Sequence, residues 1–461
     1  MAGVFEALAR LTATDRFDAI VIAGGEGEAT RAPELDHLLA ILPEGTSHWV
    51  GDGPVPVDLN VDVVTPPATL PDPGAGHRTV FCPDPELTPL AALIAMRLDA
   101  TLTGTLPEAA GELAVQVGGA ALRELGFGLD HRPEALVVAG GWAEIPYRFA
   151  RSLVDDCTGC DNGVYEHAAD VEYANLDPAA DPWGEPEMPV GRLMSYERDL
   201  LALATVLGVW HDQGAFPAPG KAALLDLLPA PWRDAALATW QDRFADRQWH
   251  RFGPEELNAP FTLDREALFA DADDADLVLV RAHGAPNALA TLTALQLDGA
   301  AIAASAGAAR PAFWLIDACA TARYLDPARF HPGADRRGNN LLSGIQRRLA
   351  LGAWMSVETV GQGSSSLWWP TVVAHPGLTA GELARRAAVA AITAYRRDRD
   401  GFELPAGLPD RAGLAADLHN ARTPMLWIGD PLTRLDPTAP APPPLEPADP
   451  PPTSGGAGTA D

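Results

Sequence analysis

Short apolar runs bounded by turn-forming residues recur along this 461-residue chain. The two clearest are Leu277–Val280 and Phe313–Ile316, and continuous runs of this length are typical of strands buried in a parallel sheet. The Ala- and Leu-rich segment between them, Leu289–Ala304, has about the length of one crossover helix. A strand, a crossover and a second strand place the two strands parallel, usually through a right-handed connection.

A chemically reactive side chain follows each of these runs. His283 and Gly284 follow the first run, and Cys319 follows the second. Because parallel strands end at the same edge of a sheet, where α/β folds place their sites, we expect the imidazole and the thiol to emerge together. That pair indicates a cysteine nucleophile with a histidine partner. Asp317, two positions before Cys319, is expected to face the same side of its strand.

Each of these residues alone also fits a structural role. A free cysteine at the end of a core strand packs as a small hydrophobic side chain. His331, in a loop shortly after Cys319, is the alternative base. Asp317 would either orient a residue of a pocket or satisfy a neighbouring backbone group.

The remaining pattern is that of an α/β protein. Further strands are expected at 17–23, 61–64, 78–82, 135–141, 354–360 and 425–430. Helices are expected at 87–98, 109–125, 196–210, 219–228, 231–246, 340–351 and 380–395, with 189–193 opening the helix at 196–210. We therefore predict an N-terminal α/β subdomain (1–134), a catalytic domain (135–435) with an acidic loop (152–191) and a helical insertion (195–248), and a disordered Pro-rich tail (436–461).

Composition narrows the class of protein. A formal net charge of −29 argues against binding to a nucleic-acid backbone, which requires clustered cations. No apolar run reaches the roughly 20 residues of a membrane span, and the first residues lack the pattern of a signal peptide. We therefore expect a cytoplasmic protein without a membrane span.

Three other features are weaker indications of function. Cys157 and Cys160 form a C-x-x-C motif, which is structural, or half of a metal site, or a redox pair. The acidic loop is a solvated surface or a cation site, and it does not match an EF-hand. The glycine turn Gly24–Gly27 lacks the Lys-Ser/Thr of a phosphate loop, which disfavours a nucleotide-binding regulator.

Five stretches, in the same order, resemble the gingipain-like cysteine peptidases of the caspase-fold clan. They are VVAGGWAEIPY (137–147), DVEYANLD (170–177) with PVGRL (189–193), RAHG (281–284), LIDACAT (315–321) and TPMLWIGDP (423–431). The resemblance covers roughly residues 135–435 and implies a three-layer αβα sandwich with mostly parallel sheets. It also implies a protein or peptide substrate, no required cofactor, and calcium as an unassigned candidate.

The resemblance carries site residues with it. It implies a dyad of His283 and Cys319, with the backbone N–H groups of Gly284 and Cys319 as oxyanion donors. It maps the specificity aspartate of arginine-specific members onto Asp170, which is alternatively a structural residue of the acidic loop. It makes Trp368 and Trp369 candidates for a wall of the substrate pocket, with core packing as the alternative.

A cysteine endopeptidase with a preference for basic P1 residues is therefore the expected function. The alternative is a catalytically silent caspase-fold scaffold in a signalling or defence system. The oligomeric state is left open.

Overall fold

The computed structural model describes part of the chain, which includes the strands and helices below. The described residues are 19–22, 47–50, 62–63, 79–81, 101–103, 135–139, 148–151, 166–169, 174, 186–194, 207–208, 211–212, 220–229, 238, 241, 247–257, 259–305, 309–322, 340–356, 377–386, 388–389, 425–437 and 439. The structural statements below refer to these residues.

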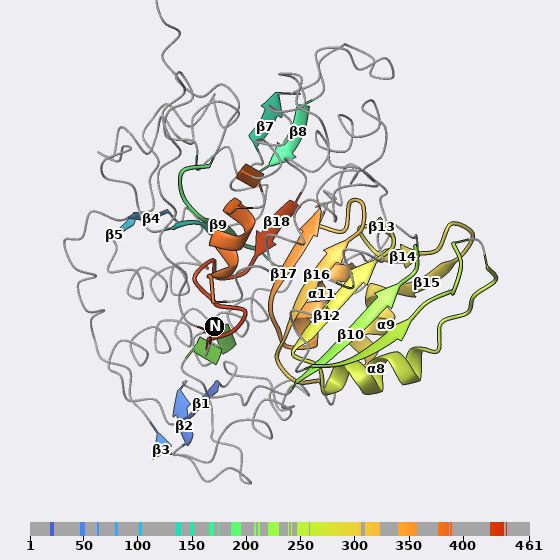
Figure 1. Ribbon diagram of the computed structural model, residues 1–461. Helices are drawn as coiled ribbons and strands as arrows, with labels where there is room; N and C mark the ends of the chain where they lie inside the picture. The colour runs from blue at the N-terminus through green and yellow to red at the C-terminus, as the bar shows by residue number, and fades with distance from the viewer. Residues whose placement is uncertain are drawn as a thin grey trace, which may run out of the picture.

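A ten-stranded sheet runs through the described part of the molecule (Figure 1). Its order is β11 (Gln248–Phe252), β10 (Lys221–Asp226), β12 (Leu277–Arg281), β16 (Ala312–Asp317), β17 (Ala350–Ser356), β18 (Met425–Ile428), β9 (Val190–Leu193), β6 (Leu136–Ala139), β4 (Thr79–Phe81) and β5 (Thr101–Thr103). Neighbouring strands are parallel except β17 and β18, which are antiparallel. The sheet therefore consists of two parallel halves that run in opposite directions, and their carboxyl ends lie at opposite edges.

Smaller sheets accompany the large one. One consists of β1 (Ala19–Ile22), β2 (Ser47–Val50) and β3 (Asp62–Val63), and a second of β7 (Arg148–Arg151) and β8 (Glu166–Ala169). A third, antiparallel sheet contains β13 (His283–Ala285), β14 (Ala288–Ala290) and β15 (Leu295–Asp298). This third sheet lies beside the carboxyl ends of β12 and β16 (Figure 1).

Three short helices cover one face of the half-sheet β10–β17. They are α8 (Arg265–Asp273), α9 (Gly299–Ala304) and α11 (Leu341–Arg347), and each begins with a side chain that caps its first turn. The main core is formed between these helices and alternate residues of the strands, including Val278, Val280, Trp314 and Ile316. Alternation along a strand places Leu279 and Leu315 on the opposite face.

The opposite face is covered as well. His211, in a helical segment at 211–212, packs edge-on against Phe313 with ring centroids 5.3 Å apart. A ring nitrogen of His211 bonds the carbonyl of Arg434 at 3.0 Å. Burial lowers the pKa of His211 below its usual value, against the opposing effect of Asp212 and the Arg434 carbonyl. A mostly parallel sheet with helices on its faces is the predicted α/β fold class, which is confirmed.

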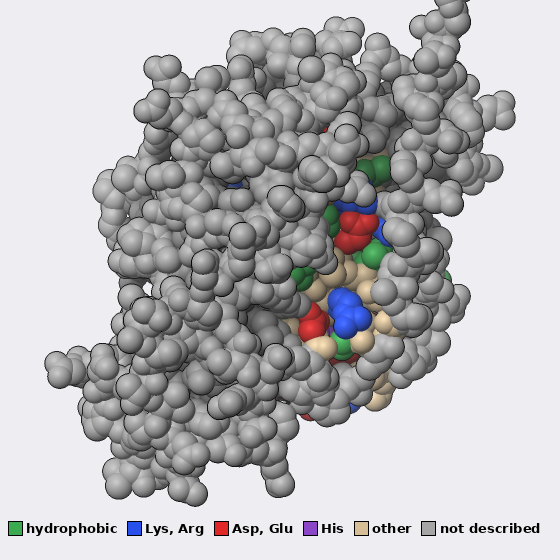
Figure 2. All heavy atoms as spheres, turned by 90° about the vertical axis from the view of Figure 1, so that its left-hand side faces the viewer, with side chains coloured by type: hydrophobic (Ala, Val, Ile, Leu, Met, Phe, Trp, Pro, Cys, Tyr) green, Lys and Arg blue, Asp and Glu red, His purple; other side chains and the backbone are tan. Residues whose placement is uncertain are grey.

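Charges of both signs occur together on the described surface. Figure 2 shows acidic and basic side chains of described residues side by side on one face. Below the surface, the largely buried Glu382 bonds Arg385 and Arg386 within one helix, at 2.6 and 2.9 Å. Within the described ranges, no helix is long and apolar enough to cross a bilayer.

The most consequential wrong prediction concerns residues 219–228. Their Ala- and Leu-rich sequence predicts a helix, but residues 221–226 form β10, an inner strand with five of its six residues buried. Ala and Leu have high helix propensity, yet propensity is a weak preference that tertiary burial overrides. The predicted helical insertion at 195–248 therefore contains a central strand.

Other boundaries differ from the expectation in smaller ways. The segment Leu289–Ala304 is not one helix, because it contributes β14, β15 and only the six-residue α9. Residues 190–193 form β9 instead of opening a helix, and the loop-rich stretch contains β8. β17 begins earlier than expected, at Ala350, and ends at Ser356. β9 and β17 pair with strands that are distant in the sequence, whereas β8 and β14 pair with strands that are next to them in the chain.

Several predictions are confirmed at the level of the element. The strands at 17–23, 61–64, 78–82, 135–141 and 425–430 correspond to β1, β3, β4, β6 and β18, and helix 340–351 contains α11. Residues 380–386 and 388–389 are helical, as expected. The predicted helices 87–98 and 109–125, the Gly24–Gly27 turn and nearly all of the tail lie outside the described residues. The domain boundary between 134 and 135 stays a prediction.

Candidate active site

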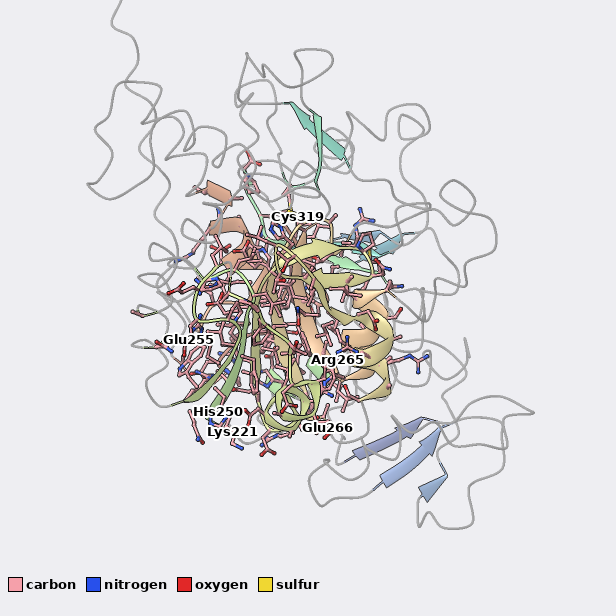
Figure 3. The ribbon with its side chains drawn as sticks, turned by 90° about the vertical axis from the view of Figure 1, so that its right-hand side faces the viewer. Lys221, His250, Glu255, Arg265, Glu266 and Cys319 are labelled. Carbon is pink, nitrogen blue, oxygen red and sulfur yellow. The ribbon has the colours of Figure 1, made fainter. Side chains whose placement is uncertain are left out.

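The edge formed by the carboxyl ends of β12 and β16 carries the candidate site. Parallel pairing aligns Arg281 with Asp317, so His283 and Cys319 each follow two positions beyond the last aligned pair. The Ala282 N–H donates to the Asp317 carbonyl at 3.2 Å and continues the contact past the strand ends. Figure 3 shows Cys319 at this end of the strands, opposite Lys221 at the start of β10. The predicted meeting of the two strand ends at one edge is confirmed.

Gly284 makes the closest approach to the cysteine. A Cβ atom added to Gly284 would lie 2.3 Å from the Cys319 carbonyl oxygen and 2.9 Å from its backbone nitrogen. Real Cβ atoms do not come this close, so only glycine allows β13 to lie against the backbone of Cys319. The strand that begins with His283 is thereby held against the residue that carries the thiol.

Access to the two side chains differs. His283 is exposed, and Cys319 is half-buried and is not part of a disulfide. The residues directly before them, Ala282 and Ala318, are buried, with 3% and 2% of their surface exposed. The arrangement can therefore present a thiol and an imidazole to a ligand that approaches this edge of the sheet.

The turn after the cysteine has an unusual backbone. Ala320 has a φ of 54°, in the left-handed region that non-glycine residues seldom adopt. Two residues later the chain is bonded to β17, because the Ala322 N–H donates to the Ser356 carbonyl at 2.7 Å. Strained residues of this kind occur at functional sites when the surrounding structure holds them in place.

A row of buried charges lies just before the strand ends. Asp226, Arg281 and Asp317 are aligned across β10, β12 and β16, so their side chains project to one face of the sheet. Arg281 Nε donates to Asp226 Oδ1 at 3.0 Å and Nη2 donates to Oδ2, and both side chains are fully buried. Arg251 Nη2 donates to the same Oδ2 at 3.1 Å.

This row was not predicted to be part of the site, although Asp317 was a candidate. Asp317 is 7% exposed at the end of β16, which makes it a buried neighbour of the site and not part of an open surface. A charged residue directly after a fully apolar run, as at Arg281, is the signal that could have revealed the row. Its partner Asp226 was hidden because its strand had been predicted as a helix.

The remaining site candidates lie outside the described residues. These are Asp170, Trp368, Trp369 and the alternative base His331, together with Cys157 and Cys160. Asp170 directly follows β8, whose last residue is Ala169. Among the described residues, no group of three or more His, Cys, Asp or Glu side chains is arranged to hold a metal ion.

Comparison with known proteins gives a match in structure. No protein-family model and no curated protein matches the sequence. A solved structure described as a protease superposes with a TM-score of 0.51 at 13% identity, covering 79% of each chain. The Arg-specific cysteine proteinase gingipain R superposes with the same TM-score at 11% identity, covering 80% of this chain and 79% of its own. At such low identity the likeness concerns the fold, and the chain has the mostly parallel α/β fold of caspase-like cysteine peptidases.

Proposed function

We propose that this protein is a cysteine endopeptidase with Cys319 as nucleophile and His283 as proton donor and acceptor. The observation that carries the proposal is the approach of Gly284 to the Cys319 backbone, because it brings two stretches from separate strands to one edge. The fold shared with gingipain R and with a second protease is consistent with it.

The chemistry follows from the groups at this edge. The Cys319 thiolate attacks the carbonyl carbon of a peptide bond and forms a tetrahedral intermediate with negative charge on oxygen. The backbone N–H groups of Gly284 and Cys319 would donate to that oxygen, which is the usual way to stabilise it. His283 then donates a proton to the leaving amine and later removes one from the water that hydrolyses the thioester.

The proposal also covers the specificity of the peptidase, its location in the cell and its response to calcium. A carboxylate of Asp170 at the floor of the pocket would pair with an arginine guanidinium and favour basic P1 residues. Trp368 and Trp369 would form an apolar wall beside it. The proposed setting is the cytoplasm, and calcium is the one metal whose effect is worth measuring.

The test is a library of fluorogenic peptides that varies the P1 residue, assayed with and without calcium. Cleavage by the wild type, its loss in Cys319→Ala and in His283→Ala, and its retention in the matched control Cys82→Ala would support the proposal. Cleavage that persists in Cys319→Ala would overturn the assignment of the nucleophile. A folded wild type that cleaves no peptide would favour the catalytically silent scaffold. Asp170→Ala should reduce cleavage after Arg more than after other residues.

A further inference from the structure

The hydroxyl group of Thr321 joins the turn that carries Cys319 to the end of a neighbouring strand. Thr321 Oγ1 donates to the Ala318 carbonyl at 3.3 Å and accepts from the Ser356 N–H at 3.3 Å. Thr321 is 2% exposed and Ser356 is fully buried, so water does not compete for either bond. One hydroxyl therefore satisfies a buried carbonyl of the turn and a buried N–H at the end of β17.

The two bonds replace strand pairing that has come to an end. The aligned pairs between β16 and β17 stop at Leu315 and Trp354. Beyond that point Ser356 contacts the turn twice, through its N–H to the Thr321 hydroxyl and through its carbonyl to the Ala322 N–H at 2.7 Å.

The position of Cys319 depends on this anchoring. The cysteine lies between Ala318, whose carbonyl accepts from Thr321, and Ala320, whose φ of 54° requires support from its surroundings. On the other side the chain at Gly284 is packed against the Cys319 backbone. A change in the turn would therefore move both the thiol and the backbone N–H of Cys319.

We propose that Thr321 is a positioning residue for the nucleophile, an inference that rests on the proposed peptidase function. Its hydroxyl holds the turn at 318–322 in the one conformation that aligns the Cys319 thiol and N–H with the substrate carbonyl. It does not touch the substrate. A shift of about 1 Å in a reacting group is enough to reduce a rate by about 100-fold.

The main experiment compares Thr321→Val, which removes the hydroxyl and keeps the shape, with Thr321→Ser, which keeps the hydroxyl. We expect kcat to fall by about 10- to 100-fold in Thr321→Val with KM nearly unchanged, and to return to within about threefold of wild type in Thr321→Ser. Thr321→Ala serves as a second hydroxyl-free variant if the valine protein does not fold.

A second readout separates positioning from a general loss of stability. The aldehyde of the best-cleaved peptide adds reversibly to the thiol and places its oxygen where the oxyanion forms, whereas the corresponding uncleavable peptide alcohol only occupies the pocket. Thr321→Val should weaken aldehyde binding by the same factor as kcat and leave alcohol binding unchanged. The matched control is Thr379→Val, since Thr379 Oγ1 accepts from the Glu382 N–H at 3.3 Å at a distance in the chain from the turn. Thr379→Val should leave kcat, the affinity for the aldehyde and the affinity for the alcohol unchanged.

The failure of this proposal can be told from the failure of the peptidase function. If Cys319 is required for cleavage but Thr321→Val and Thr321→Ala keep kcat and aldehyde affinity within twofold of wild type, Thr321 is not a positioning residue. If the wild type cleaves nothing, the peptidase function fails, and alkylation of Cys319 by iodoacetamide becomes the test. An alkylation rate that Thr321→Val changes at least fivefold and Thr321→Ser restores would then support a positioning role for Thr321. An unchanged alkylation rate would overturn that role.

Discussion

The buried pair of Asp226 and Arg281 leads to the sharpest prediction about stability. Both side chains have no exposed surface, and two hydrogen bonds join the guanidinium to the carboxylate. Asp226→Asn keeps the size of the side chain but removes the negative charge. It therefore removes the buried carboxylate that bonds the buried guanidinium of Arg281. Loss of one partner from a buried pair costs about 3–5 kcal/mol.

That cost is large beside the whole stability of a folded domain, which is about 5–15 kcal/mol. We expect urea denaturation, followed by far-UV circular dichroism, to show a midpoint shift that corresponds to a loss of at least about 3 kcal/mol. The double variant Asp226→Leu/Arg281→Met removes both charges and should recover most of this loss, since apolar replacements of buried pairs are often neutral.

Arg251→Gln is the matched control. Arg251 bonds the same carboxylate oxygen at 3.1 Å, but its side chain is 37% exposed, so its removal should cost no more than about 1 kcal/mol. A loss below about 1 kcal/mol in Asp226→Asn, equal to that of the control, would refute the reasoning that burial makes this pair indispensable. A double variant no more stable than Asp226→Asn would also contradict it.

Three further predictions concern the site and its support. Gly284→Ala should reduce peptide cleavage by about 100-fold or more, since its methyl group would meet the Cys319 carbonyl; Ala285→Gly is the control, and equal activity in both variants would contradict the close approach. Ala320→Gly should preserve or raise the melting temperature while Ala320→Val lowers it, because a β-branched side chain is disfavoured at a φ of 54°; similar melting temperatures would argue against strain there. Burial lowers the pKa of His211, so the unfolded chain takes up a proton below about pH 6.5 before the folded chain does. The stability that the neutral imidazole provides above that pH is lost as the pH falls through the pKa of the folded state. His211→Gln should remove this part of the loss, measured by urea denaturation at a series of pH values. Identical pH dependence in the variant and the wild type would refute this role of His211.

The sequence was most informative about the strands that carry the candidate dyad. The runs before His283 and Cys319 are apolar throughout, and a fully buried parallel strand is the simplest structure that accommodates them. Parallel strands end at one edge, so the meeting of the two segments followed from local pattern and topology alone. The α/β class followed for the same reason.

The candidate site also contains features that no local pattern reveals. The partner of Arg281 is 55 residues away in the chain, and the N–H that bonds the Thr321 hydroxyl belongs to a residue 35 positions later. Hydrogen bonds over such separations depend on which strands become neighbours. The strand that carries the partner of Arg281, β10, has a sequence that suits a helix.

The sequence by itself thus determined the class of fold and the edge at which a thiol and an imidazole emerge, because buried strands leave a strong local pattern. Only the tertiary structure decided that residues 221–226 form an inner strand of the sheet, that β17 and β18 reverse its direction, and that a buried ion pair joins Asp226 of β10 to Arg281 of β12. It also decided that Gly284 lies against the backbone of Cys319 and that the Thr321 hydroxyl bonds both Ala318 and Ser356. The physical reason is that burial and pairing between distant segments outweigh the small conformational preferences of individual residues.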